Sequence, residues 1–121
     1  MAGKVLINLG TGLEDGEKVT VAFLVAGAAL DRGREVAMFL TQEAVRLALP
    51  GQAEGVFCDG CPPLERLFEQ FAQAGGELMV CPFCVNARKL DAETFVAHAR
   101  VAGATPMFDW LGDEPGTVFS Y

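Results

Sequence analysis

Residues 77–84 read ELMVCPFC, and this stretch decides the fold. Its opening ELMV predicts a short buried strand, because a compact apolar run bounded by turn residues is typical of a strand in a sheet. Pro82 follows almost at once, and its fixed φ suits the first turn of a helix. The stretch therefore predicts a strand that passes directly into a helix, with Cys81 at the junction and Cys84 one turn further on.

The same alternation of strand and helix extends in both directions. Short apolar runs predict strands at residues 4–9, 35–40, 77–80, 99–102 and 116–121. Capping or breaking residues mark the helices: Glu14 and Asp15 before one that ends at Gly33, Thr41 before one that ends at Pro50, Pro62 and Pro63 before one that ends at Gly75, Pro82 before one through Arg88, Asp91 before a short one, and Thr105 with Pro106 before the last. We therefore expect residues 1–121 to form one three-layer α/β/α domain around a five-stranded parallel sheet.

Composition narrows the possible partners. The 121 residues are 51% hydrophobic and carry a net charge of −7, which argues against a nucleic-acid partner because such proteins rely on basic patches. The longest uncharged apolar stretch, residues 19–30, is too short to cross a bilayer. We expect no export signal and a cytoplasmic location. The mean hydropathy of +0.30 and the apolar 19–30 helix favour a homo-oligomer.

Cys81 and Cys84 are the candidate catalytic residues. In open α/β sheets, reactive groups gather beyond the carboxyl ends of the strands, which is where Cys81 falls. A helix start offers unpaired N–H groups that favour a thiolate on Cys81, and Cys84 lies close enough to form a disulfide with it. The pair therefore predicts thiol chemistry that needs no cofactor, or, in the bland interpretation, a buried cysteine pair without chemistry.

A second pair, Cys58 and Cys61, leaves alternatives open. The spacing Cys58-x2-Cys61-x19-Cys81-x2-Cys84 also fits a four-cysteine structural zinc site, and we expect the two pairs to face each other across one edge of the sheet. Without an export signal, reduced thiols or a metal site are favoured over structural disulfides. Two alternatives to a protein with a reactive Cys81 nucleophile therefore stay open. One is a structural metal-binding or assembly protein, and the other is a thiol–disulfide reductase that cycles Cys81–Cys84.

Other motifs carry less chemistry. Residues 10–12 (GTG) follow the first strand but lack the G-x-G-x-x-G pattern and the phosphate-binding lysine, so a tight turn is expected there. His98, the single histidine, has no serine or carboxylate motif around it, which predicts a structural or surface role rather than a catalytic one. Phe108 and Trp110 are expected in a core or an interface.

In the order and spacing of its motifs the chain resembles the DsrE/DsrF-like proteins of intracellular sulfur relay. The shared features are the GTG turn with Asp15, the Ala-rich helix with Gly33, the strand at residues 35–40, Pro63–Leu64, Phe71, Gly75–Gly76, Cys81, Ala87–Arg88, Gly103–Ala104 and the closing TVFSY. The resemblance implies trimers or hexamers, a persulfide carried on Cys81, and donor and acceptor protein partners. Lys89 departs from a frequent glycine, and Cys58 and Cys61 match nothing typical. Our hypothesis is that Cys81 carries sulfane sulfur and that Cys84 resolves the persulfide or tunes Cys81.

Overall fold

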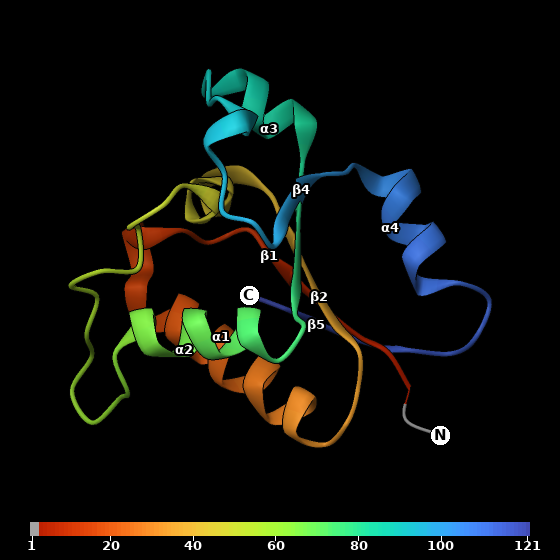
Figure 1. The fold of residues 1–121 in the computed structure, drawn as a ribbon, viewed down its shortest axis with the longest axis horizontal. Coiled ribbons are helices and arrows are strands. Elements are labelled where there is room, and N and C mark those ends of the chain that lie inside the picture. The colour runs from red at the N-terminus through yellow and green to blue at the C-terminus, as the bar shows by residue number, and fades with distance from the viewer. Residues whose placement is uncertain (1–2) are drawn as a thin grey trace.

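Five parallel strands form the centre of the molecule in the computed structural model, which describes residues 3–121 (Figure 1). The strands are β1 (Val5–Leu9), β2 (Val36–Leu40), β3 (Glu77–Val80), β4 (Ala99–Val101) and β5 (Thr117–Ser120). They lie in the order β4-β3-β2-β1-β5, and each neighbouring pair is parallel. The expected five-stranded parallel sheet is therefore confirmed.

Helices cover the two faces of the sheet unequally. The α-helices are α1 (Gly16–Asp31), α2 (Leu64–Gln73), α3 (Pro82–Ala87) and α4 (Ala104–Leu111), and the 3-10 helices are η1 (Leu13–Asp15), η2 (Gln42–Ala48) and η3 (Ala92–Thr94). In Figure 1, α1 and α2 lie together on one side of the sheet, whereas α4 lies alone on the other. The α/β/α layering is confirmed, with one thick outer layer and one thin one.

Side chains that alternate along each strand build two cores of different size. Ile7 and Leu9 of β1 point into the large core, where they meet Phe23 of α1 and Phe71 of α2. The small core on the opposite face consists of Leu6, Ala37, Met79 and Ala102, covered by Phe39 and by Met107, Trp110 and Leu111 of α4. The large core supplies most of the apolar burial, and α4 closes only part of the other face.

The carboxyl ends of the three central strands lie level with one another. Leu9 pairs with Leu40, and Leu40 pairs with Val80. The ladder continues one residue further, because the Thr41 amide donates to the Leu9 carbonyl and the Cys81 amide to the Leu40 carbonyl, each at 3.0 Å. The segments that follow β1, β2 and β3 are thereby brought to a single edge.

Two expected helices differ from the sequence-based predictions. The segment after Thr41 is the 3-10 helix η2 rather than an α-helix, and Thr41 makes no side-chain cap. Pro50 has no N–H to donate to the Arg46 carbonyl, so this carbonyl accepts from the Leu49 amide instead, in the 3-10 pattern. The Ala48 carbonyl accepts from the Val96 amide.

The last helix, α4, begins one residue before its expected cap. Its N-cap is Gly103 rather than Thr105, and Pro106 falls in the first turn, where its missing N–H is not needed. At the start of α1, where Glu14 and Asp15 are expected to open the helix, Asp15 is its N-cap, and its carboxylate accepts the Lys18 amide at 3.1 Å.

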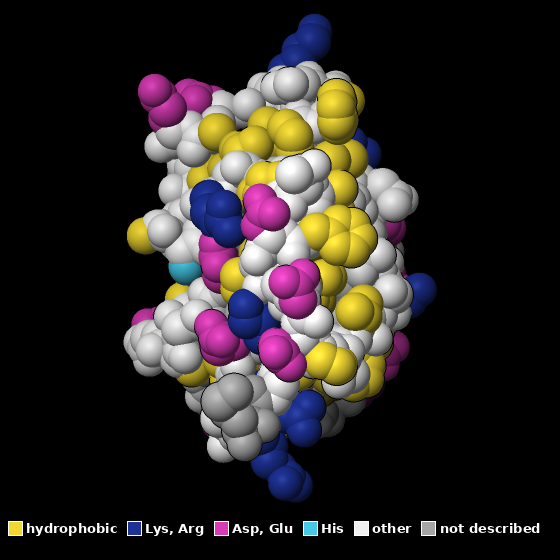
Figure 2. All heavy atoms as spheres, turned by 90° about the vertical axis from the view of Figure 1, so that its right-hand side faces the viewer, with side chains coloured by type: hydrophobic (Ala, Val, Ile, Leu, Met, Phe, Trp, Pro, Cys, Tyr) yellow, Lys and Arg dark blue, Asp and Glu magenta, His cyan; other side chains and the backbone are white. Residues whose placement is uncertain are grey.

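Some large apolar side chains are exposed on the thinly covered side of the sheet and on α3. Phe108 of α4 and Val118 of β5 are 66% and 55% exposed, and Phe83 of α3 is 81% exposed. Figure 2 views the molecule from the α4 side and shows hydrophobic side chains spread among acidic and basic ones. Within residues 3–121, no helix is both long and apolar enough to cross a membrane.

His98 packs against the aromatic part of the large core rather than lying free on the surface. Its ring lies 5.1 Å from the ring of Phe68 and 6.1 Å from that of Phe71, measured between centroids. Its Nε2 atom is buried and has no hydrogen-bond partner among residues 3–121. Burial lowers the pKa of His98 below its ordinary value of 6.5, because charging the ring would require solvation that this site does not provide.

The lowered pKa of His98 predicts a loss of stability in mild acid. The unfolded chain binds a proton at His98 more readily than the folded one, so the free energy of unfolding should fall as the pH drops through about 6.5 toward the lower folded pKa. In His98→Phe, which keeps the aromatic contacts but cannot titrate, the decline should be shallower. Urea denaturation at a series of pH values between about 7.5 and 5 measures both. Identical pH profiles for the two proteins would contradict this role.

Candidate functional site: a cysteine pair at the carboxyl edge of the sheet

Cys81 and Cys84 lie where β3 passes into α3. Cys81 is the residue before the first helical position, and Cys84 lies one turn further on. Both are free thiols and half-buried. Their backbone is well fixed, since the Cys81 amide bonds the Leu40 carbonyl and the Cys81 carbonyl accepts from Val85 at 3.0 Å. The structure thus places both predicted site residues at the predicted edge.

Helix α3 is too short to polarise Cys81 as the sequence predicts. It has only six residues, and its first, Pro82, has no N–H. A full helix dipole therefore does not act on Cys81, and Cys81 makes no side-chain cap to the helix. Any hydrogen-bond donor to these thiols therefore has to come from outside α3.

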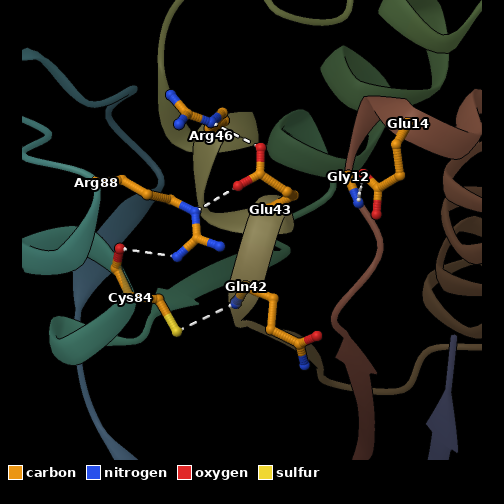
Figure 3. Close-up of polar contacts among 7 residues, drawn as sticks. All are labelled: Gly12, Glu14, Gln42, Glu43, Arg46, Cys84 and Arg88. Carbon is orange, nitrogen blue, oxygen red and sulfur yellow. Dashed lines mark hydrogen bonds and ion pairs between the residues drawn. The ribbon is translucent and has the colours of Figure 1, made fainter.

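Such a donor is the backbone of Gln42, which directs its N–H at the sulfur of Cys84. The distance from the Gln42 nitrogen to Cys84 Sγ is 3.1 Å, and the contact joins residues 42 positions apart (Figure 3). Gln42 has a φ of 55°, a left-handed conformation that a residue with a side chain adopts at a cost of about 1 kcal/mol or more. An N–H aimed at sulfur stabilises negative charge on it. Strained backbone is therefore what turns this donor toward the thiol.

The side chain of Gln42 points the other way. Its Nε2 atom lies near Thr41 Oγ1, at 3.5 Å, and a Cβ atom added at Gly10 would come within 3.0 Å of it. In Figure 3 the Gln42 amide extends away from Cys84 while the backbone nitrogen faces the sulfur. The main chain, rather than the side chain, is therefore the part of Gln42 that serves the site.

A network of ion pairs holds α3 against η2 beside the thiols. Arg88 Nε lies 2.5 Å from one oxygen of Glu43, and Arg46 Nε lies 2.9 Å from the other. Arg88 also donates through an Nη atom to the Cys84 carbonyl at 3.3 Å. The hydrogen bond from Arg88, and to a smaller extent the one from Arg46, holds the pKa of Glu43 below its ordinary value of 4.5. Arg88 thus links the cysteine turn to the loop that carries Gln42 (Figure 3).

The turn that ends α3 keeps a left-handed residue despite the absence of glycine. Lys89 has a φ of 55°, and the Leu90 amide reaches back to the Val85 carbonyl at 3.1 Å. This arrangement is the usual helix-ending motif with a left-handed residue, in which glycine is preferred. Lys89 therefore preserves the turn after Arg88 and carries its strain, which resolves the departure noted in the sequence.

Gly12 allows the loop after β1 to approach the same region. A Cβ atom at Gly12 would lie 2.7 Å from the Glu43 carbonyl oxygen and 2.9 Å from Glu43 Cβ. The Gly12 amide donates to Glu14 Oε1 at 2.8 Å (Figure 3). Residues 10–12 form no turn of their own but lead from β1 into η1, so the expected tight turn is not found there. The missing side chain at Gly12 still lets η2, and hence Gln42, lie close to this loop.

Cys58 and Cys61 do not join the other pair. They form a disulfide with each other, with a Cα–Cα distance of 5.2 Å, in the segment between η2 and α2. That segment, yellow-green in Figure 1, descends toward α2 and away from α3. Among residues 3–121 no group of three or more His, Cys, Asp or Glu side chains is placed to hold a metal ion. The expectation that the pairs face each other is wrong, and so is the preference for reduced or metal-bound cysteines at 58 and 61.

The four-cysteine zinc hypothesis fails for a geometric reason. A tetrahedral zinc site needs four thiolates within bonding reach of one ion, whereas two of these sulfurs are bonded to each other and the other two lie beyond a different strand. Gln42 and Glu43, in contrast, belong to the site and were not found from the sequence. The spacing of Glu43 and Arg46 suggests their local ion pair, but nothing nearby in the sequence indicates the contacts with Cys84 and Arg88.

The protein is an α/β protein with a pair of thiols at the carboxyl edge of a parallel five-stranded sheet. Comparison with known proteins gives its family. Residues 3–116 match the DsrE/DsrF-like family, and the chain belongs to it. An uncharacterised protein of Methanopyrus kandleri is 30% identical over 103 residues, covering 85% of this chain and 82% of that one.

Two solved structures share the fold. The ychN protein from E. coli superimposes with a TM-score of 0.78 at 16% identity, covering 98% of this chain and 99% of that one. A protein of unknown function from Methanobacterium thermoautotrophicum gives a TM-score of 0.74 at 8% identity, with coverage of 98% and 99%. At these identities the likeness extends to the fold alone.

The packing of Gly12 against η2 predicts opposite effects for two glycine substitutions. Gly12→Ala places a methyl group against the Glu43 backbone and should lower the free energy of unfolding by about 1–3 kcal/mol. It should also change the rate at which Cys84 is alkylated. Gly27→Ala, in the middle of α1 with no atom within 4 Å of the added Cβ, should be neutral or stabilise by up to about 1 kcal/mol. Urea denaturation and alkylation monitored by mass spectrometry measure both, and equal effects would argue against the close approach.

Proposed function

We propose that this protein is a sulfur-relay protein that carries persulfide sulfur on Cys81 and transfers it to a partner thiol. The observation that carries the proposal is the pair of free thiols at the carboxyl edge of the sheet. The sulfur of Cys84 accepts a hydrogen bond from the Gln42 backbone N–H. Membership of the DsrE/DsrF-like family supports it, because the family resemblance implies sulfur relay at the cysteine after the third strand.

The transfer needs only thiols. The Cys81 thiolate attacks the outer sulfur of a donor persulfide, the donor leaves as a thiolate, and Cys81 holds the persulfide. An acceptor thiolate then attacks the outer sulfur on Cys81, which leaves as a thiolate again. Each step forms one bond to sulfur and breaks one, so neither step requires a metal or a cofactor.

Cys84 has a distinct role in this scheme. Its sulfur, which accepts the Gln42 N–H, can attack as a thiolate the inner sulfur of the Cys81 persulfide, which forms a Cys81–Cys84 disulfide and releases hydrosulfide. A dithiol reductant then restores both thiols. Cys84 therefore limits how long Cys81 stays loaded, unless the acceptor arrives first.

The proposal includes the setting in which the relay works. Donor and acceptor are proteins, and residues 1–121 act as one domain in the cytoplasm. Further copies of the chain cover the thinly layered face, because Phe108 and Val118 expose apolar surface there that a single copy leaves in water. A trimer or hexamer is the assembly that the family resemblance implies.

Sulfur loading provides the direct test. After incubation with a persulfide donor, intact mass spectrometry should show one added sulfur on the wild-type chain and none on Cys81→Ser. In Cys84→Ser the adduct should persist several-fold longer, because the internal attack is removed. The Cys58→Ser/Cys61→Ser variant is the control and should load like the wild type.

Two outcomes would count against the relay. An adduct that survives in Cys81→Ser places the sulfur elsewhere. Redox cycling of Cys81–Cys84 with a defined reduction potential, but without any sulfur adduct, would identify a thiol–disulfide reductase instead.

Light scattering tests the assembly. The wild-type chain should have a mass several times that of one copy, and Phe108→Ser should shift it toward the single-chain mass because a polar group replaces buried apolar area. Phe57→Ser is the matched control, since Phe57 is 70% exposed but lies in the segment before α2. A monomeric wild-type chain, or equal effects of the two substitutions, would remove the proposed interface.

A further inference from the structure

The Cys58–Cys61 disulfide forms a second sulfur centre, separate from Cys81 and Cys84. It spans the sequence Cys58-Asp59-Gly60-Cys61, and the Cys61 amide closes the turn onto the Cys58 carbonyl at 3.0 Å. Gly60 has a φ of 78°, the left-handed conformation that such a turn uses. Both cysteines are half-buried, while Asp59 and Gly60 between them are exposed. The bond is thus presented at the tip of a tight surface turn.

This disulfide is not needed to hold its segment in place. The Leu64 amide bonds the Val56 carbonyl at 3.1 Å and so closes the chain around the turn independently. Leu64 is fully buried, and Val56 packs on the large core, where its Cγ1 would lie 2.9 Å from a Cβ at Gly16. A cross-link between residues three apart also closes a short loop, which restricts the unfolded chain little. The bond can therefore open and close while the fold remains.

An open cleft adjoins the turn. It has a volume of about 520 Å³ and is lined by Phe57, Pro63, Glu65, Arg66 and Glu69, among others. Phe57, the residue just before Cys58, is 70% exposed. A cleft of this size beside an exposed aromatic ring accommodates the side chains of a docked polypeptide.

The charges around the turn select for a positive partner. Glu54, Asp59, Glu65 and Glu69 supply four carboxylates between residues 54 and 69, against the single cation of Arg66. An attacking thiolate with negative neighbours is repelled by this field, and one with positive neighbours is attracted.

We infer that Cys58–Cys61 is a redox centre that accepts two electrons from the dithiol of a partner protein whose thiols are flanked by basic residues. One partner thiolate attacks one sulfur of the bond, forms a mixed disulfide and releases the other cysteine as a thiolate. The second partner thiol then attacks the mixed disulfide. The partner leaves as a disulfide, and Cys58 and Cys61 remain as two thiols, so the electrons and bonds balance.

The experiment uses the full chain with Cys81→Ser and Cys84→Ser as the parent protein, so that Cys58 and Cys61 are the cysteines whose redox state is measured. Dithiothreitol in native buffer should reduce the bond without a change in the circular dichroism spectrum. At matched thiolate concentrations, the cationic thiol cysteamine should react about tenfold faster than the anionic mercaptoethanesulfonate, once both rates are divided by those with a neutral small disulfide. Asp59→Asn should reduce this ratio about threefold.

Several results would overturn the inference. The centre is structural if the bond resists dithiothreitol until the chain unfolds, or if Cys58→Ser/Cys61→Ser melts far below the parent. The proposed partner chemistry is wrong if the two charged thiols react equally, or if Asp59→Asn leaves the ratio unchanged. Because the two relay thiols are absent from the parent, none of these results depends on the sulfur-relay proposal.

Discussion

The hydrogen-bond ladder that continues one residue past the ends of β1, β2 and β3 is the constraint on which the site depends. The amides of Thr41 and Cys81 extend this ladder, so the loops after three separate strands emerge at one level. Parallel strands always bring their carboxyl ends to the same edge, but only this register brings Gln42 beside Cys84. A shift of one residue would also turn each strand's buried side chains to the opposite face, so the cores and the site are fixed together.

Much of the fold follows from local sequence because each strand is a short apolar run with a clear stop. The strand at Glu77–Val80 and the helix that Asp15 opens are local features, and both could be predicted. The 3-10 form of η2 could not be predicted, since it depends on a hydrogen bond to the Ala48 carbonyl from the Val96 amide, 48 residues away. The Gly103 cap could not be predicted either, because side-chain capping preferences favour Thr105 and say nothing of the path by which the chain leaves β4.

The two cysteine pairs show the limits of spacing as a guide. Both have two residues between the cysteines, yet Cys81 and Cys84 are free and Cys58 and Cys61 are bonded. Their surroundings differ: one pair spans a strand-to-helix junction fixed by the sheet, and the other closes a surface turn. The position of Cys81 was readable from the sequence, because a buried strand leads into it. The donor to the Cys84 sulfur was not, because Gln42 lies in another strand's loop.

The contact to Cys84 is made by the main chain of Gln42, and this affects how the site can vary. Every residue except proline carries a backbone N–H, so a change of side chain at position 42 leaves the donor in place as long as the left-handed turn is kept. Glycine would adopt that turn without strain. The contact is thus inherited through the path of the backbone rather than through a particular amino acid. Two proteins can therefore share this contact although their residues at this position differ, and a sequence alignment would not reveal it.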